Sequence, residues 1–328
     1  MSAKKMNSLQ AVNAALHQAM AEDDKVIVLG EDIADREGGG VTGATAGLST
    51  KFGDDRVKST PISEQAIIGA AIGAALAGYK PVAEIMLMNF TAVAMDMIFN
   101  HAAKLRFMSG GQSTVPITIR TLTGAGWQTA GQHADHLEGW FAHTAGIKVV
   151  APSNPVDYAG LLLSCIQDPD PCIFIESAGS LFIPAEVPDV IVPVPLGKAR
   201  VVQEGTDVTI VSWSSQVIRC QQALAPLAEA GISVELIDLR TVSPWDKEAV
   251  LASVAKTGRA VIAHEAVRHF GPGGEIASTI AEELFGQLKA PVRRLGAPYS
   301  PVPFAKVLED AYIVSPDRVV ETVKALMA

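Results

Sequence analysis

The sequence predicts an α/β fold of two doubly wound domains, in which parallel strands alternate with helices. Short continuous apolar runs such as Val26–Leu29 are typical of strands buried on both faces, and helical patterns separate them. The length of 328 residues fits two domains of roughly 150 residues each. A proline-rich stretch interrupts the alternation, so we expect a domain over 1–183, a linker over 184–200 and a second domain over 201–328.

The first half begins with a helix and then alternates. Leu9, Val12 and Leu16 form one apolar face of a predicted helix over Asn7–Met20. The predicted strands are Val26–Leu29, Pro81–Ile85, Val115–Arg120, Lys148–Ala151 and Cys172–Ile175. The other predicted helices are Gln65–Gly78, Thr91–Arg106, one near His133–Thr144, and Pro155–Gln167.

The second half repeats this alternation on a smaller scale, which indicates a second α/β domain. Its predicted strands are Asp207–Trp213, Ser233–Leu239, Ala260–His264 and Val292–Leu295. Its predicted helices span 215–230, 246–257 and Glu275–Leu284.

Composition excludes several classes of partner. The net charge is −9 and no Lys/Arg-rich run occurs, so nucleic acid and anionic membranes are not expected partners. No signal-like apolar core occupies the first 20 residues, and the apolar stretches are too short to span a membrane. Cys165, Cys172 and Cys220 are expected to be buried free thiols of a cytoplasmic protein.

Glu64 is the first candidate site residue. It follows Thr60-Pro61-Ile62-Ser63 and precedes a run, Gln65–Gly78, that is apolar on every side and therefore predicts a buried helix. We expect Glu64 near the base of a crevice. A buried carboxyl without a cation tends to stay protonated, and it can then donate a hydrogen bond to a ligand nitrogen. The alternative is an acid that only balances the helix dipole.

A histidine cluster, His133, Asp135, His136 and His143, is the second candidate site. The spacing of His133 and His136 would place both on one helix face, as in some zinc sites, but no third ligand follows in order. The glycine-rich loop Thr123–Gly131 instead favours His133 at the mouth of a cleft, where an imidazole can transfer protons. The alternative is a histidine packed under the loop. None of the glycine-rich loops matches a nucleotide-binding motif.

Six segments then share one family pattern in family order. They are Val28–Asp32, Thr60–Gln65, Asn100–Arg106, Gly131–His133, Ala142–Val150 and Ile237–Thr241. Along its whole length the chain resembles the beta subunit of the thiamine-diphosphate-dependent decarboxylating component of 2-oxo acid dehydrogenase complexes, closest to the acetoin and pyruvate dehydrogenase branch. The resemblance implies a pyrimidine-binding domain followed by a transketolase C-terminal-like domain.

The resemblance also implies an activity. Such a subunit helps to cleave a 2-oxo acid or acetoin to a thiamine-bound enamine, and the acyl unit passes oxidatively to a lipoyl group. One alternative is a split transketolase-like carboligase, which transfers a two-carbon unit without oxidation. Another is a non-catalytic scaffold that docks the acyltransferase core.

The family pattern assigns roles to individual residues. Glu64 and His133 match catalytic positions, and Ile62, Met86 and Phe90 match the pocket around the pyrimidine ring. A potassium ion, held mainly by backbone carbonyls, is implied at four further positions. These positions are Ile117, Cys165, Asp168 and Asp170.

One departure from the family pattern and one absent motif affect these expectations. The family's H-S-Q-S segment is His133-Ala134-Asp135-His136 here, which implies a changed charge beside the reacting centre. The Gly-Asp-Gly motif that holds the Mg²⁺ and diphosphate of thiamine enzymes is absent from this sequence. We therefore expect an alpha subunit to supply that half of the site in an α2β2 heterotetramer, with a lipoyl acyltransferase core as a further partner.

Overall fold

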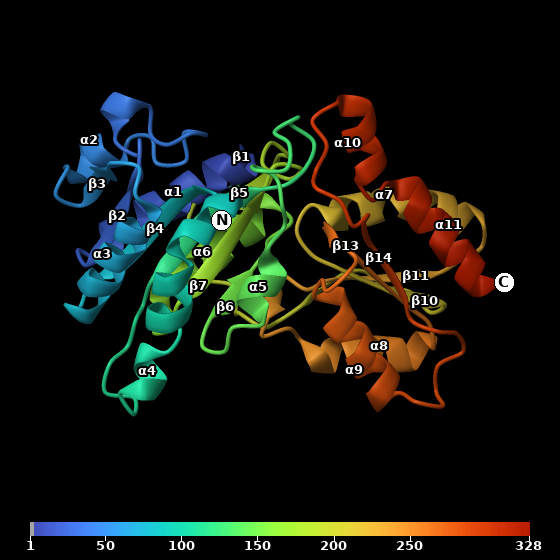
Figure 1. The fold of residues 1–328 in the computed structure, drawn as a ribbon. Helices are drawn as coiled ribbons and strands as arrows, with labels where there is room; N and C mark the ends of the chain where they lie inside the picture. Colours follow the sequence, from blue (N-terminus) through green and yellow to red (C-terminus); the bar gives the residue numbers. More distant parts are fainter. Residues whose placement is uncertain (1–2) are drawn as a thin grey trace.

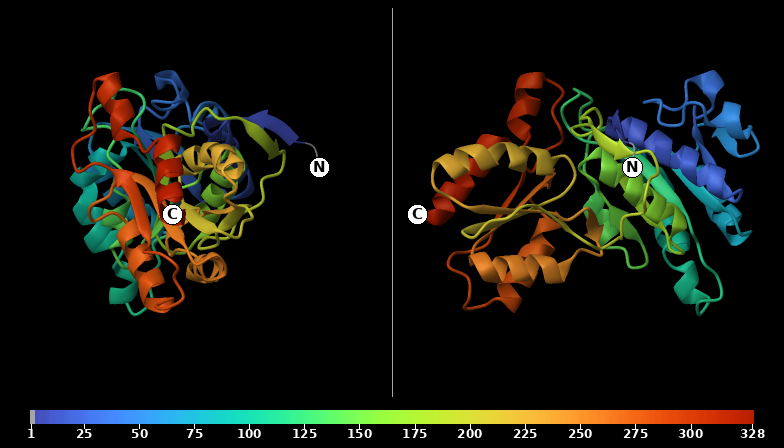
Figure 2. Two further views of the ribbon diagram at one scale, coloured as in Figure 1. Left: turned by 90° about the vertical axis from the view of Figure 1, so that its right-hand side faces the viewer. Right: turned by 180° about the vertical axis from the view of Figure 1, so that it is seen from behind.

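The computed structural model describes residues 3–328 and places two helix-covered sheets side by side (Figure 1). A seven-stranded sheet comes mainly from the first half of the chain, and a five-stranded sheet comes from the second half. Helices cover both faces of each sheet, as the view from behind also shows (Figure 2). The predicted α/β fold of two doubly wound domains is confirmed.

The larger sheet has the order β12-β6-β7-β5-β4-β2-β3 and is parallel except at the β12–β6 pair. Its strands are β2 (Val26–Glu31), β3 (Val57–Thr60), β4 (Lys80–Leu87), β5 (Thr118–Thr123), β6 (Lys148–Val150), β7 (Cys172–Ser177) and β12 (Thr241–Ser243). One face packs on α1 (Ser8–Glu22), α2 (Leu48–Phe52) and α6 (Pro155–Gln167), and the other on α3 (Glu64–Leu76) and α5 (Glu138–Ala142). Because helices bury both faces, the central strands read as continuous apolar runs.

The segment predicted as one helix over Thr91–Arg106 is broken into short pieces. They are the 3₁₀ segment η2 (Met88–Ala94), the π-helical segment η3 (Met97–Ala102) and α4 (Leu105–Met108). The Thr91 hydroxyl donates to the carbonyl of Met88 at 2.5 Å, a local bond that competes with the helical pattern. The predicted single α-helix is therefore wrong in type and regularity, although residues 88–102 are helical without a gap. Such irregular segments are frequent at functional sites.

The helix α3 is not buried on every side, contrary to expectation. Its inward residues, including Ile67 and Ile68, are buried, whereas Ala66, Ala70 and Gly73 are exposed. Within this chain the helix therefore presents an apolar face to solvent, an arrangement that usually marks a surface covered by another molecule.

The smaller sheet has the order β14-β13-β10-β11-β9. Its strands are β9 (Arg200–Gln203), β10 (Val208–Ser212), β11 (Val234–Asp238), β13 (Ala260–Val267) and β14 (Arg293–Ala297). Its helices are α7 (Gln216–Glu229), α8 (Lys247–Thr257), α9 (Gly273–Glu283), α10 (Lys306–Tyr312) and α11 (Pro316–Met327). The helices α10 and α11 were not predicted, although Ser315 and Pro316 form an N-terminal capping signal for α11.

The two halves are joined more closely than a simple linker implies. Within the predicted linker, β8 (Ala185–Pro188) pairs with β1 (Ala3–Met6), and β12 from the second half extends the first sheet. One apolar cluster continues across both domains and includes Ile173 and Trp213. The strands β1, β3, β8, β9 and β12 were not predicted, because runs of three or four residues carry too little periodicity.

Two smaller expectations concern cysteines and membranes. Cys165, Cys172 and Cys220 are buried free thiols, as predicted, and burial raises the pKa of Cys220 to about 11. Over residues 3–328, no helix has both the length and the apolar character needed to cross a membrane.

Candidate active site

Candidate residues from separate segments gather where the winding of the larger sheet reverses. After β2 the chain turns to β3 on one side, and after β4 it continues to β5 on the other. The crevice between the carboxyl ends of β2 and β4 is the place where open α/β sheets bind ligands. Glu31 ends β2, Glu64 begins the helix after β3, and Met86 lies near the end of β4.

Glu64 is a buried acid with no bonded cation. It is 9% exposed, and no side-chain hydrogen bond or ion pair joins it to another described residue. The neighbouring Glu31 accepts a hydrogen bond from the backbone N–H of Ser63, and burial together with the charge of Glu64 raises the pKa of Glu31. The predicted burial of Glu64 is confirmed, and its carboxyl group remains available to a ligand.

An apolar wall stands beside these acids. Ile62 is 82% exposed, whereas Met86 and Phe90 are partly buried. The helix that Glu64 begins packs against η2, the segment that carries Phe90. The ring of Phe90 meets the ring of His133 edge to face, with 5.4 Å between centroids and 74° between planes. The structure therefore brings both candidate segments together at one end of the sheet.

The loop that carries His133 is anchored in the second domain. Buried Glu309 of α10 accepts hydrogen bonds from the backbone N–H groups of Gly126 at 2.7 Å and Gln128 at 3.1 Å. Gln128 and Ala130 have positive φ angles of 56° and 64°, conformations that cost roughly 1–3 kcal/mol each. The bonds to Glu309 help to hold this strained loop, so the position of His133 depends on both domains.

Asp135 and His136, the residues expected to change the charge beside the reacting centre, both have partners in the structure. The Oδ2 atom of Asp135 accepts a hydrogen bond from Asn89 at 2.8 Å. The buried ring of His136 lies between Glu138 at 3.5 Å and Glu265 at 3.4 Å. Burial lowers the pKa of His136, but the two carboxylates outweigh burial and raise it to about 10. The imidazole of His136 is therefore paired with carboxylates, whereas the carboxylate of Asp135 is bonded to a neutral amide.

The zinc geometry suggested by the histidine spacing does not form. The predicted helix near 133–144 begins only at Glu138, so His133 and His136 lie on a turn and an extended segment. His133 faces Phe90, whereas His136 faces Glu138 and Glu265. The two rings therefore contact different residues.

Comparison with known proteins identifies the family. Residues 4–182 match the transketolase pyrimidine binding domain, and residues 197–319 match the transketolase C-terminal domain. The beta subunit of acetoin:2,6-dichlorophenolindophenol oxidoreductase from Cupriavidus necator is 43% identical, and the match covers 99% of this chain and 98% of the relative. The pyruvate dehydrogenase E1 component subunit beta of Acholeplasma laidlawii is 42% identical over 97% of each chain. The chain belongs to this family of dehydrogenase beta subunits.

A solved structure shows the same fold for the beta subunit at lower identity. A split-gene transketolase chain, described as an inactive β4 tetramer, superposes with a TM-score of 0.81 at 21% identity. The match covers 98% of each chain, so the two domains share their arrangement as well as their topology.

A buried ion triad lies at the same end of the larger sheet of this beta subunit. Arg120, 2% exposed, lies 2.7 Å from Glu84 and 2.6 Å from Glu176 on the neighbouring strands. Burial lowers the pKa of Arg120, but the two carboxylates outweigh burial and raise it. Burial raises the pKa of Glu176, an effect that Arg120 partly offsets.

The four predicted potassium positions meet at the opposite end of the sheet in this beta subunit. The carbonyl of Cys165 accepts from the N–H of Asp168 at 3.2 Å, and the carbonyl of Ile117 accepts from Cys172 at 2.9 Å. The carboxylates are already engaged, because Lys148 bonds Asp168 at 2.6 Å and Arg106 bonds Asp170 at 2.6 Å. A potassium ion would therefore depend on backbone carbonyls, and this site stays a prediction.

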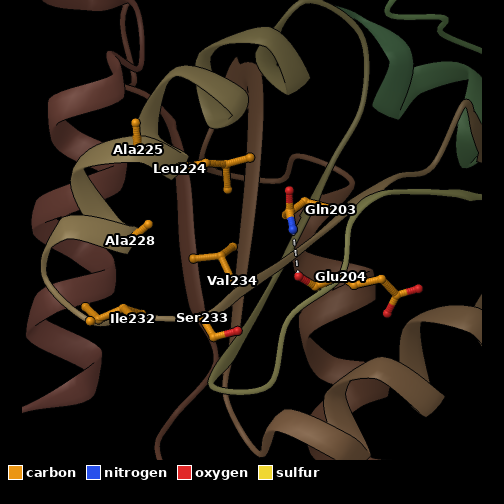
Figure 3. Close-up of a pocket in the computed structure, with 9 residues that line it drawn as sticks. Gln203, Glu204, Leu224, Ala225, Ala228, Ile232, Ser233 and Val234 are labelled. Carbon is orange, nitrogen blue, oxygen red and sulfur yellow. Dashed lines mark hydrogen bonds between the residues drawn. The ribbon is translucent and has the colours of Figure 1, made fainter.

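A separate surface cavity of about 450 Å³ lies between α7 and the strands β9 and β11 (Figure 3). Leu224, Ile232 and Val234 form its apolar lining. It opens at the amino end of β11, whereas ligands of open α/β sheets bind at the carboxyl ends. Its carboxylate, Glu204, already lies 3.5 Å from Lys256. We assign no chemistry to this cavity.

Sequence reasoning missed several residues around the beta-subunit site. Asn89, Glu31 and Glu309 contact candidate segments, but each belongs to a different part of the chain. The ion triad could have been found from the sequence, because Glu84 and Arg120 are charged residues within otherwise apolar runs. Such residues are rarely buried unless they are paired.

Proposed function

We propose that this beta subunit works with an alpha subunit as a thiamine-diphosphate-dependent dehydrogenase of acetoin or a 2-oxo acid. The observation that carries the proposal is the buried carboxyl of Glu64 at the switch point, without a bonded partner in residues 3–328. The printed names of the relatives support it, since one is an acetoin oxidoreductase subunit and another a pyruvate dehydrogenase subunit.

Glu64 is proposed to bond the pyrimidine ring of the cofactor. When bound, thiamine diphosphate supplies a reactive carbon that adds to carbonyl groups and accepts electrons. A carboxyl in a site of low polarity can share a proton with a ring nitrogen. Glu31 lies beside Glu64, and burial together with the charge of Glu64 raises the pKa of Glu31.

Ile62, Met86 and Phe90 are proposed to line the ring, and His133 to transfer protons. Exposed Ile62 offers an apolar contact that residues 3–328 leave uncovered. The edge-to-face contact with Phe90 orients the imidazole of His133 at the same end of the sheet. Imidazole exchanges protons near neutral pH, so His133 can take or return a proton at the substrate oxygen.

The alpha subunit is proposed to complete the site. The exposed α3 residues Ala66, Ala70 and Gly73 and the exposed Ile62 leave a continuous apolar surface beside Glu64. The absence of a Gly-Asp-Gly motif indicates that another chain holds the Mg²⁺ and the diphosphate. We infer an α2β2 heterotetramer with a shared cofactor, to which a lipoyl acyltransferase core binds.

The paired cations favour acetoin over a 2-oxo acid as substrate. A 2-oxo acid carries a carboxylate, and its binding site normally provides a cation or several hydrogen-bond donors. At this end of the sheet Arg120 and His136 each lie between two carboxylates, and Arg219 contacts Glu265 at 3.4 Å. These cations are thus paired with carboxylates of the same chain and are not free to bind a substrate carboxylate. A neutral hydroxyketone such as acetoin needs no such cation.

The experiment is to purify the beta subunit with its alpha partner and follow reduction of 2,6-dichlorophenolindophenol. We expect faster turnover with acetoin than with pyruvate or branched-chain 2-oxo acids. A preference for pyruvate would overturn the assignment of acetoin as substrate but would still support the proposed dehydrogenase activity. Full turnover and tight cofactor binding by the beta subunit alone would refute the shared site.

The carboligase alternative is separated by the same preparation. If no substrate reduces the dye but a two-carbon unit is transferred from a ketose to an aldehyde, the non-oxidative activity is favoured. The 21% identity to the split-gene transketolase supports a common fold and no more. The identity of 43% to an acetoin oxidoreductase subunit favours the oxidative reaction.

A further inference from the structure

We propose that Asn89 and Asp135 form a clamp that positions His133 against Phe90, a role that rests on the proposed function. Asn89 immediately precedes Phe90 in η2, directly after β4. Asp135 lies two residues after His133 in the loop segment. The pair is a positioning device: Asn89 and Asp135 bond each other, while His133 is the group that meets the substrate.

Three hydrogen bonds define the clamp. The Nδ2 atom of Asn89 donates to the Oδ2 atom of Asp135 at 2.8 Å, and the backbone N–H of Asp135 donates back to the Oδ1 atom of Asn89 at 3.2 Å. The same Nδ2 atom also donates to the carbonyl of Gly131 at 3.4 Å. One amide thus holds the chain two residues before and two residues after His133.

The residues next to His133 are held by contacts of their own. Ala134, the next residue, is buried in a cluster with Val302 and Tyr312 of the second domain. The hydroxyl of Thr123 donates to the carbonyl of Asp135 at 2.6 Å. With its neighbours fixed on these sides, the imidazole of His133 lies against Phe90. Catalytic groups depend on such support, because displacement by about 1 Å can reduce turnover on the order of a hundredfold.

The chemistry of the pair predicts a specific pattern of variants. Asn89→Asp places two carboxylates at hydrogen-bond distance and removes both side-chain donors, so the clamp should open. Asp135→Asn keeps an oxygen that can accept from Asn89, so its effect should be small. The exchanged pair, Asn89→Asp with Asp135→Asn, restores one donor facing one carboxylate. Asn89→Ala removes the bonds without adding charge.

Two measurements test the clamp on the complex with its partner. The first is kcat. We expect Asn89→Asp and Asn89→Ala to lose on the order of tenfold to a hundredfold, and Asp135→Asn to stay near wild type. The exchanged pair should recover part of the loss, because it restores the bond between the two side chains but not the bond to the carbonyl of Gly131. The second is the rate at which diethyl pyrocarbonate modifies His133, followed by mass spectrometry with exposed His101 as reference. We expect several-fold faster modification in the two Asn89 single variants only.

The reactivity of His133 does not depend on which substrate the enzyme uses. Altered modification with unaltered turnover would keep the clamp and remove the catalytic role of His133, which belongs to the proposed function. Unchanged modification in Asn89→Asp and Asn89→Ala would overturn the clamp. Failure of the exchanged pair to restore His133 toward wild-type reactivity would also overturn it, because simple loss of packing predicts that two substitutions are worse than one.

Discussion

The imidazole of His136 and the carboxylate of Glu265 lie 3.4 Å apart and join the two domains of the beta subunit. His136 precedes α5 of the first domain, whereas Glu265 belongs to β13 of the second. Glu265 also lies 3.4 Å from Arg219 and accepts a hydrogen bond from the hydroxyl of Ser177 at 3.2 Å. One buried carboxylate thus gathers three partners at the domain interface, next to the loop of His133.

Replacing His136 with Gln should remove a pH-dependent part of the stability. The pKa of His136 rises from 6.5 in the unfolded chain to about 10 in the folded one, so its stabilising charge is present in full below pH 6.5 and is lost as the pH rises toward 10. Thermal melting between these two pH values should therefore show a steeper loss for wild type than for His136→Gln.

The second buried imidazole, that of His264, does not affect the interpretation of this melting experiment. Burial lowers the pKa of His264 to about 4, so His264 stays neutral throughout the window. Glu138 and Glu265, the acids that face His136, have lowered pKa values and stay ionised there. If the melting temperatures of the wild type and of His136→Gln fell equally over this pH range, the result would contradict the ion pair.

Replacing Glu64 with Gln should abolish most of the turnover without changing assembly. The amide keeps the shape of the side chain but cannot share a proton, and such proton transfers contribute typically 10²–10⁴-fold to rates. Dye reduction by the complex gives the turnover, and gel filtration gives the assembly. Glu229→Gln, on the exposed side of α7, is the matched control. Unchanged turnover would leave Glu64 as an acid that only balances the dipole of α3.

Replacing Gly73 with Leu should prevent assembly while the chain still folds. Outside the helix's own nearby backbone, a Cβ atom at Gly73 meets no atom of residues 3–328 within 4 Å. Gly is about 0.8–1 kcal/mol less favourable in a helix than Ala, and Leu ranks close to Ala. The melting temperature of the isolated chain should therefore be maintained or raised, whereas a partner packed on α3 would meet the larger side chain. Gln222→Leu, on the exposed face of α7, is the control for added apolar surface. Normal assembly of Gly73→Leu would place the interface elsewhere.

Replacing Arg120 with Met should be strongly destabilising. The change leaves Glu84 and Glu176 buried side by side without their cation, and breaking a buried ion pair in this way costs about 3–5 kcal/mol. Urea denaturation measures the loss. Lys306→Met, which breaks the exposed pair with Asp310, should cost no more than about 1 kcal/mol. Equal effects of the two variants would mean that the triad contributes little to folding.

Local patterns predicted the regular elements well. The capping signals at Asn7 and Asn154 and the apolar periodicity place α1 and α6 close to their predicted bounds. Gly78 follows the end of α3 with φ of 91°, the left-handed conformation expected of a terminating glycine. The segment after β4 was predicted as one regular helix, because its change from 3₁₀ to π-helical to α-helical structure has no periodic signature.

The candidate site was also predicted only in part, because local patterns reveal some of its residues and not their partners. The burial of Glu64 follows from the apolar helix that it begins, and the family pattern points to His133. The partners of Asp135 and His136 were not predicted, because Asn89 and Glu265 come from distant segments.

The sequence by itself determined the order of the longer strands and helices and the identity of the acid and the imidazole, since these depend on local periodicity and motifs. Only the tertiary structure decided which charges are neutralised and where His133 faces. Those outcomes depend on the reversal of winding between β2 and β4 and on the contact between two domains. Both bring together side chains whose proximity no local pattern encodes.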